Sequence, residues 1–142
     1  MKLLAVVLVS CFIIYVESVI PKELLSDTIK RKEAEWHDKC KRYTGVAENV
    51  IDDMKDGNFP NDESAKRYIS CIWTLNGPFD RDYRMDSLKM LDFLHDNHLE
   101  DGTEYVRCNQ EAINSGAKSF ELFWNMQQCI QKSVDSSKYL LF

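Results

Sequence analysis

Apolar residues recur every three or four positions along most of the chain, which is the spacing of amphipathic helices. The clearest case has its apolar residues at Ala65, Tyr68, Ile69, Ile72 and Trp73. No segment alternates apolar and polar residues over the length of a β-strand. The pattern therefore predicts an all-α fold with about six helices, over approximately residues 21–44, 46–56, 65–75, 88–94, 103–115 and 119–135.

Glycine and proline mark the expected ends of these helices, because glycine accepts the left-handed conformation that closes a helix and proline cannot continue one. The expected stops are Gly45, Gly57 and the run Asn76-Gly77-Pro78. Asp62 is the expected N-cap of the third helix. The expected connections in the second half of the chain are a charged segment over residues 79–84 and a polar loop over residues 95–102.

The last helix carries two apolar stripes instead of one. The first consists of Phe120, Phe123, Trp124, Ile130 and Val134, and the second of Leu122, Met126 and Cys129. A helix that is apolar on nearly its whole circumference is usually buried on all sides. We therefore expect this helix to lie at the centre of the fold.

Residues 1–18 have the form of a secretory signal peptide. A lysine near the start is followed by an apolar run over residues 3–16. A membrane span needs about 20 apolar residues, so this run is too short to be one. We expect cleavage after Ser18, which would leave residues 19–142 as one secreted, extracellular domain.

Length, composition and charge narrow the class of protein further. A chain of 142 residues fits one domain, and 44% hydrophobic residues is too many for a disordered chain. The formal net charge is −5. Nucleic-acid-binding proteins concentrate positive charge, so a nucleic-acid partner is not expected.

Four cysteines, Cys40, Cys71, Cys108 and Cys129, remain once the signal peptide is removed. An even number in a secreted chain of this size predicts two disulfides, and the spacing alone leaves all three pairings open. Zinc sites usually use pairs of ligands two to four residues apart. The gaps here are 30, 36 and 20 residues, so no metal site is expected.

Two short stretches between the cysteines add to this pattern. One is the run Cys40-Lys41-Arg42-Tyr43-Thr44-Gly45-Val46, and the other is Phe59-Pro60-Asn61-Asp62, followed by Lys66 and Tyr68 before Cys71. Together with the cysteine spacing, they make the chain resemble an insect odorant-binding protein of the pheromone-binding and general-odorant-binding type. The resemblance extends over about residues 21–135.

That family has six cysteines, with three residues between the second and third and eight between the fifth and sixth. Aligning Cys71 as the third and Cys129 as the sixth places Arg67 and Phe120 at the second and fifth positions. Those two cysteines bond to each other in the family, so the chain resembles the reduced-cysteine (minus-C) branch. The resemblance implies the bridges Cys40–Cys71 and Cys108–Cys129.

The resemblance also implies six helices around a single apolar pocket that binds small hydrophobic ligands such as odorants or pheromones. Candidate lining residues are the aromatic, methionine and aliphatic side chains on predicted inward faces and at the C-terminus: Met54, Tyr68, Ile72, Trp73, Met90, Phe93, Leu94, Phe120, Phe123, Trp124 and Phe142. The competing interpretation is an ordinary close-packed core. Met suits a pocket because its flexible thioether adapts to varied shapes.

Other functions find less support in the sequence. It contains no Gly-x-Ser-x-Gly, His-Glu-x-x-His or phosphate-binding loop motif, so neither an enzyme nor a cofactor is expected. His95 and His98 lie among carboxylates and are candidates for a pH-dependent switch, the alternative being two exposed loop histidines. A membrane chemoreceptor is a candidate partner, and the expected state is a monomer or weak homodimer.

Two competing hypotheses remain from the sequence. The first is a carrier of the same fold that acts in haemolymph, saliva, venom or reproductive fluid. The second is a secreted helical signalling or interaction protein with a filled core. Uptake of a fluorescent hydrophobic probe would separate this last class from the carriers.

Overall fold

The structure is a computed structural model that describes residues 27–76, 78–91 and 99–134. The expected signal peptide lies outside the described residues. The described part folds into six α-helices, which confirms the predicted all-α class: α1 (Asp27–Thr44), α2 (Glu48–Lys55), α3 (Glu63–Asn76), α4 (Ser87–Leu91), α5 (Leu99–Asn114) and α6 (Phe120–Ser133).

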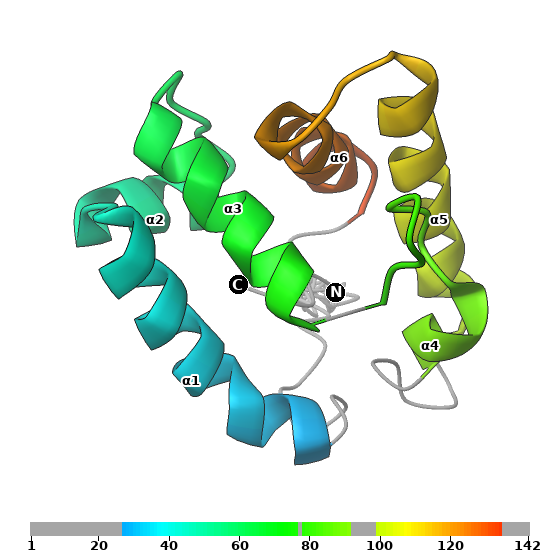
Figure 1. Cartoon of the computed structure of the whole chain (residues 1–142), viewed down its shortest axis with the longest axis horizontal. Helices are drawn as coiled ribbons and strands as arrows, with labels where there is room; N and C mark the ends of the chain where they lie inside the picture. Colours follow the sequence, from blue (N-terminus) through cyan, green and yellow to red (C-terminus); the bar gives the residue numbers. More distant parts are fainter. Residues whose placement is uncertain (1–26, 77, 92–98, 135–142) are drawn as a thin grey trace, which may run out of the picture.

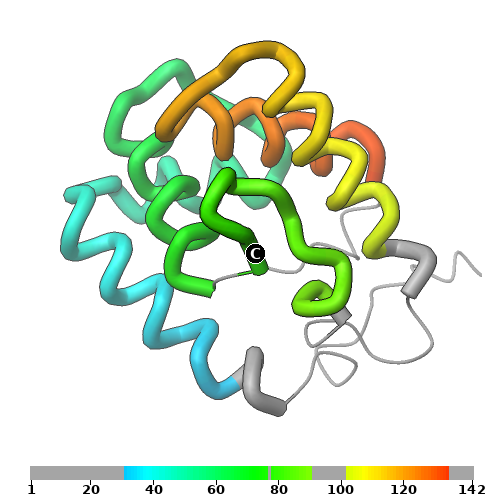
Figure 2. Tube along the Cα trace, turned by 45° about the vertical axis from the view of Figure 1, so that its right-hand side comes forward, coloured from blue at the N-terminus to red at the C-terminus, as the bar shows by residue number. Residues whose placement is uncertain are grey.

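Five of the described helices pack in the spatial order α1, α3, α6, α5 and α4 (Figure 1). α3 packs against α1 on one side and α6 on the other, and α6 also packs against α5. α4 lies next to α5. In Figure 2 the connection from α3 to α4 runs across the molecule toward α5. The central position predicted for the last helix is confirmed by its contacts with both α3 and α5.

The helix ends follow the sequence signals. The side chain of Asp62 accepts a hydrogen bond of 2.8 Å from the backbone N–H of Ala65, so it caps α3 as predicted. Gly45 has a φ of +71° directly after α1, and Gly57 a φ of +84° after α2. These left-handed conformations favour glycine, which explains both stops.

Two disulfides connect neighbouring helices. Cys40 of α1 is bonded to Cys71 of α3, and Cys108 of α5 is bonded to Cys129 of α6. These are the bridges that the resemblance implied. Because α3 also packs against α6, the two covalently linked helix pairs share one core.

Two segments differ from the prediction. Residues 99–102 were expected in a loop, yet α5 begins at Leu99. The prediction rested on the polar character of residues 95–102, and glycine inside a helix also costs about 1 kcal/mol relative to alanine. Gly102 is buried, which indicates that packing outweighs this cost. The segment 79–84 is more ordered than a plain connector, since Phe79 pairs with Met85 in an antiparallel bridge.

None of the helices in the described ranges is long and apolar enough to cross a membrane.

Candidate functional site

Most of the candidate pocket residues come together in one buried cluster. They come from four helices, and each is at most 5% exposed: Met54 of α2, Tyr68, Ile72 and Trp73 of α3, Met90 of α4, and Phe123 and Trp124 of α6. The cluster therefore joins both disulfide-linked halves of the fold. An interior of this composition offers apolar and polarisable surface without charge.

Aromatic rings form the middle of this cluster. The ring of Phe79 lies edge-on to Trp73 at 5.9 Å and to Phe123 at 5.2 Å between centroids. Tyr105 of α5 is 6.1 Å from Trp73. Phe79 and Tyr105 were not among the candidates. The signal for Tyr105 was its apolar position in the fifth predicted helix, whereas Phe79 was hidden by the charged residues that follow it.

The polar groups of Trp73 and Tyr68 in this cluster are both hydrogen-bonded. The indole N–H of Trp73 donates a hydrogen bond of 2.8 Å to Oε1 of Gln127, which is itself 2% exposed. The hydroxyl of Tyr68 is hydrogen-bonded to Nδ1 of His37 on α1. Burial raises the pKa of the Tyr68 phenol, so the hydroxyl keeps its proton at neutral pH. These bonds hold α3 to α6 and to α1.

Asn109 of α5 holds the loop between α3 and α4 against the core. Its Oδ1 accepts a hydrogen bond of 2.8 Å from the N–H of Met85, and its Nδ2 donates one of 3.0 Å to the carbonyl of Tyr83. Tyr83 has a φ of +60°, and its ring lies edge-on to Phe123 at 5.8 Å. Asn109 thus fixes a strained loop that covers part of the aromatic cluster.

Phe120 does not join the buried cluster. Its ring is 36% exposed and lies beneath the guanidinium of Arg67, at 5.4 Å from Cζ to the ring centre. The two residues line a surface groove of about 320 Å³ together with Tyr43, Ser70, Cys71, Thr74, Leu75 and Ser119. Phe120 fails as an inner residue because it begins α6 and lies on the side that faces solvent.

A second surface groove, of about 520 Å³, lies between the end of α2 and α6. Its lining is mainly polar and consists of Lys55, Asp56, Gly57, Phe59, Gln128, Gln131 and Lys132. Such a lining is a poor match for an apolar ligand. The polar lining of this groove therefore differs from the apolar surface of the buried cluster.

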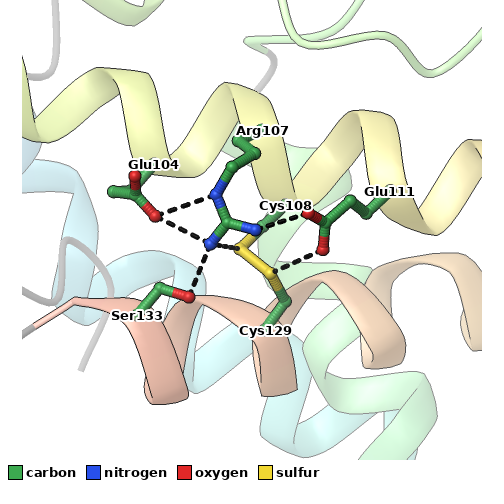
Figure 3. Close-up of polar contacts among 6 residues, drawn as sticks. All are labelled: Glu104, Arg107, Cys108, Glu111, Cys129 and Ser133. Atoms are coloured by element: carbon green, nitrogen blue, oxygen red, sulfur yellow. Dashed lines mark hydrogen bonds and ion pairs between the residues drawn. A yellow bond between two sulfur atoms is a disulfide. The ribbon is translucent and has the colours of Figure 1, made fainter.

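A charged network covers the second disulfide (Figure 3). The guanidinium of Arg107 donates hydrogen bonds to Glu104 at 2.7 Å and Glu111 at 2.5 Å on its own helix, and to Oγ of Ser133 on α6 at 2.6 Å. The bonds to Glu104 and Glu111 raise the pKa of Arg107 further, so its charge is permanent. The network adds polar contacts across the α5–α6 junction beside Cys108.

Five predicted residues lie outside the described residues: the pocket candidates Phe93, Leu94 and Phe142, and the pH-switch candidates His95 and His98. Within the described ranges, no group of three or more His, Cys, Asp or Glu side chains could hold a metal ion.

The small helical fold, its two bridges and its cysteine spacing define the class of protein. The model of the PBP/GOBP family matches residues 22–133, which is most of the chain. The chain therefore belongs to the PBP/GOBP family, the insect pheromone-binding and general-odorant-binding proteins. This confirms the resemblance found in the sequence, and it indicates a carrier of small hydrophobic ligands. No curated protein matches the chain significantly.

Proposed function

We propose that this protein is an extracellular, non-catalytic carrier that binds and solubilises small hydrophobic molecules such as odorants or pheromones. The observation that carries the proposal is the family match over residues 22–133. The buried cluster supports it, because a ligand of this kind needs apolar and aromatic surface. Residues 1–18 would serve as the signal peptide that exports the chain.

The proposed binding surface is formed by candidate residues of the buried cluster from α2, α3, α4 and α6. Its residues are Met54, Tyr68, Ile72, Trp73, Met90, Phe123 and Trp124, with Phe93, Leu94 and Phe142 as further candidates. Burying about 300 Å² of ligand at roughly 25 cal/mol/Å² gives about 7 kcal/mol before the entropy of association is subtracted. A dissociation constant of 1 μM corresponds to about 8 kcal/mol, so this gain gives affinities no tighter than the micromolar range, which suits a carrier that must also release its ligand.

Displacement of a fluorescent probe tests this proposal. N-phenyl-1-naphthylamine fluoresces more strongly in an apolar environment, so a carrier should enhance its emission and release it to aliphatic competitors. The mature chain should bind the probe at micromolar concentration. Absence of any enhancement would contradict the proposal and favour a secreted helical interaction protein with a filled core.

The tissue in which the protein acts is tested by where it is expressed. Expression in antennal sensilla would support an olfactory role, and expression in saliva, venom or haemolymph would support the same carrier in another fluid. A membrane chemoreceptor is the proposed downstream partner, and a monomer or weak homodimer the proposed state. Sedimentation measured at increasing protein concentration tests the proposed oligomeric state.

A further inference from the structure

The face of α3 that points away from the core lines a surface groove. Arg67, Ser70 and Thr74 lie three and four residues apart, so they share one face of the helix. All three line the groove of about 320 Å³ that also contains Phe120. The buried residues of α3 lie on the opposite side of the helix. The groove is therefore separate from the buried cluster.

Three large apolar side chains from three helices surround this groove. Tyr43 near the end of α1 is 84% exposed, Leu75 of α3 is 45% exposed, and Phe120 at the start of α6 is 36% exposed. Exposed apolar side chains that gather in one place mark binding surfaces of soluble proteins. The disulfide from Cys40 to Cys71 joins α1 to α3 here, so the walls on these two helices are held together covalently.

Arg67 is the one charged residue among those that line the groove. Its Nε and Nη2 both donate to Oε1 of Glu63, which occupies one edge of the planar guanidinium. The other edge, which includes Nη1, has no acceptor among the described residues. Both side chains are more than half exposed, so their pairing contributes little stability and competes weakly with a ligand. A carboxylate can accept two parallel hydrogen bonds from such an edge.

A second copy of the chain matches this groove poorly. A two-fold contact centred on the groove would place Arg67 opposite the Arg67 of the second copy, because both copies present the same surface. Like charges that face each other across an interface disfavour association. A neutral hydrocarbon would use the apolar walls but not the guanidinium. The groove therefore favours an anionic molecule with a hydrocarbon body.

We infer that this groove is a second ligand site, and that it binds a small amphiphile with one carboxylate and a short hydrocarbon body, such as a medium-chain fatty acid. The carboxylate pairs with Arg67, and the hydroxyl of Ser119, which makes no cap hydrogen bond to α6, is a further donor. The hydrocarbon body lies against Tyr43, Leu75 and Phe120. A volume of about 320 Å³ is small for a ligand site, which suits a short chain. This inference goes beyond the proposed carrier function and needs no ligand in the buried cluster.

Octanoate and its neutral counterpart 1-octanol test the inference, with binding followed by amide shifts in NMR spectra of the mature chain. Octanoate should shift the amides of Tyr43, Leu75 and Phe120 until they saturate, and it should bind there about tenfold more tightly than 1-octanol. Arg67→Gln removes the charge at a position that is mostly exposed, so the variant should fold normally. R67Q should bind octanoate about tenfold more weakly and lose the preference for the carboxylate.

Arg42→Gln is the matched control, because Arg42 is an exposed arginine of α1 that pairs with Asp38 and does not line the groove. R42Q should bind octanoate within about twofold of the wild type. Tyr43→Ala removes an apolar wall without disturbing the core, since Tyr43 is almost fully exposed. Y43A should bind octanoate severalfold more weakly and still prefer it to 1-octanol.

Four outcomes would overturn this site. The first is equal affinity of R67Q and the wild type for octanoate. The second is acetate binding as tightly as octanoate, which would mean that the apolar walls contribute nothing. The third is a shift of the same amides when protein concentration alone is raised, which would assign the groove to a second copy.

The fourth outcome separates the groove from the buried cluster. Octanoate shifts confined to buried residues such as Ile72 and Phe123 would overturn the groove site and support the carrier function. Failure of the wild type to take up N-phenyl-1-naphthylamine, with the groove amides still shifted by octanoate, would contradict the carrier function and support the separate site.

Discussion

The guanidinium of Arg67 on α3 lies over the ring of Phe120 at the start of α6, with 5.4 Å between Cζ and the ring centre. These are the two positions at which the sequence resemblance placed a bonded pair of cysteines that this chain lacks. A cation–π contact joins the two positions instead, and a contact of this kind contributes about 0.5–1 kcal/mol at an exposed site. Arg67 is also paired with Glu63 on its own helix.

Restoring the cysteine pair should create a third disulfide. Arg67→Cys combined with Phe120→Cys places two thiols on helices that already meet at these side chains. On the loop-closure model such a bridge removes up to about 4 kcal/mol of unfolded-chain entropy, so the melting temperature should rise by several degrees. Mass spectrometry of non-reduced peptides detects the bond.

The single variants R67C and F120C are the controls for this experiment, since neither can form the intramolecular bond. They should melt slightly below the wild type because each removes the cation–π contact. A double variant that keeps two free thiols under oxidising conditions would show that the alignment of these positions is wrong.

Replacing Gln127 by leucine should destabilise the core. The indole N–H of Trp73 would lose the acceptor that lies 2.8 Å away, and an unpaired buried donor costs about 1–3 kcal/mol. Urea unfolding, followed by tryptophan fluorescence, measures the loss. Adding Trp73→Phe in the same chain removes the unpaired donor as well, so the double variant should lose less than the sum of the two single changes.

The N-cap of α3 should make part of the stability depend on pH. The hydroxyl of Ser64 and the backbone N–H of Ala65 donate to Asp62 and hold the pKa of its carboxyl below the ordinary value of 3.8. A carboxyl with a lowered pKa in the folded state contributes stability above its unfolded pKa. That contribution is lost as the pH falls through 3.8 and below.

Asp62→Asn isolates this effect, because asparagine keeps the capping oxygen but does not titrate in this range. The difference in unfolding free energy between wild type and D62N should favour the wild type at neutral pH and shrink as the solution is acidified. A difference that stays constant down to strongly acidic pH would rule out the cap as its source.

The network around Arg107 should add more stability than an ordinary surface ion pair. Arg107→Ala removes contacts to two carboxylates and to Ser133 on the neighbouring helix. Arg42→Ala, the control, removes a pair with Asp38 on the same helix, in which both side chains are mostly exposed. R107A should therefore lower the melting temperature more than R42A, and high salt should reduce the difference. Equal losses would show that the α5–α6 contact adds nothing.

Local signals in the sequence were sufficient for the helices and most of their ends. The cap at Asp62 and the stops at Gly45 and Gly57 depend on the conformations of a few neighbouring residues, which sequence pattern reports directly. The start of α5 was missed because residues 95–102 are mostly polar and end in a glycine, whereas the burial of Gly102 is a property of the packed fold. The number of disulfides followed from the cysteine count, whereas their pairing followed only from the resemblance to the family.

The apolar periodicity also determined which side chains would be buried, and seven of the pocket candidates lie in the core for that reason. Only the tertiary structure decided how buried polar groups are paired, because partners such as Trp73 and Gln127 lie 54 positions apart in the chain. It also moved Phe120 to the surface beside Arg67. The spacing of apolar residues assigns a side chain to one face of its helix. Which side chain it contacts on another helix depends on how the helices pack.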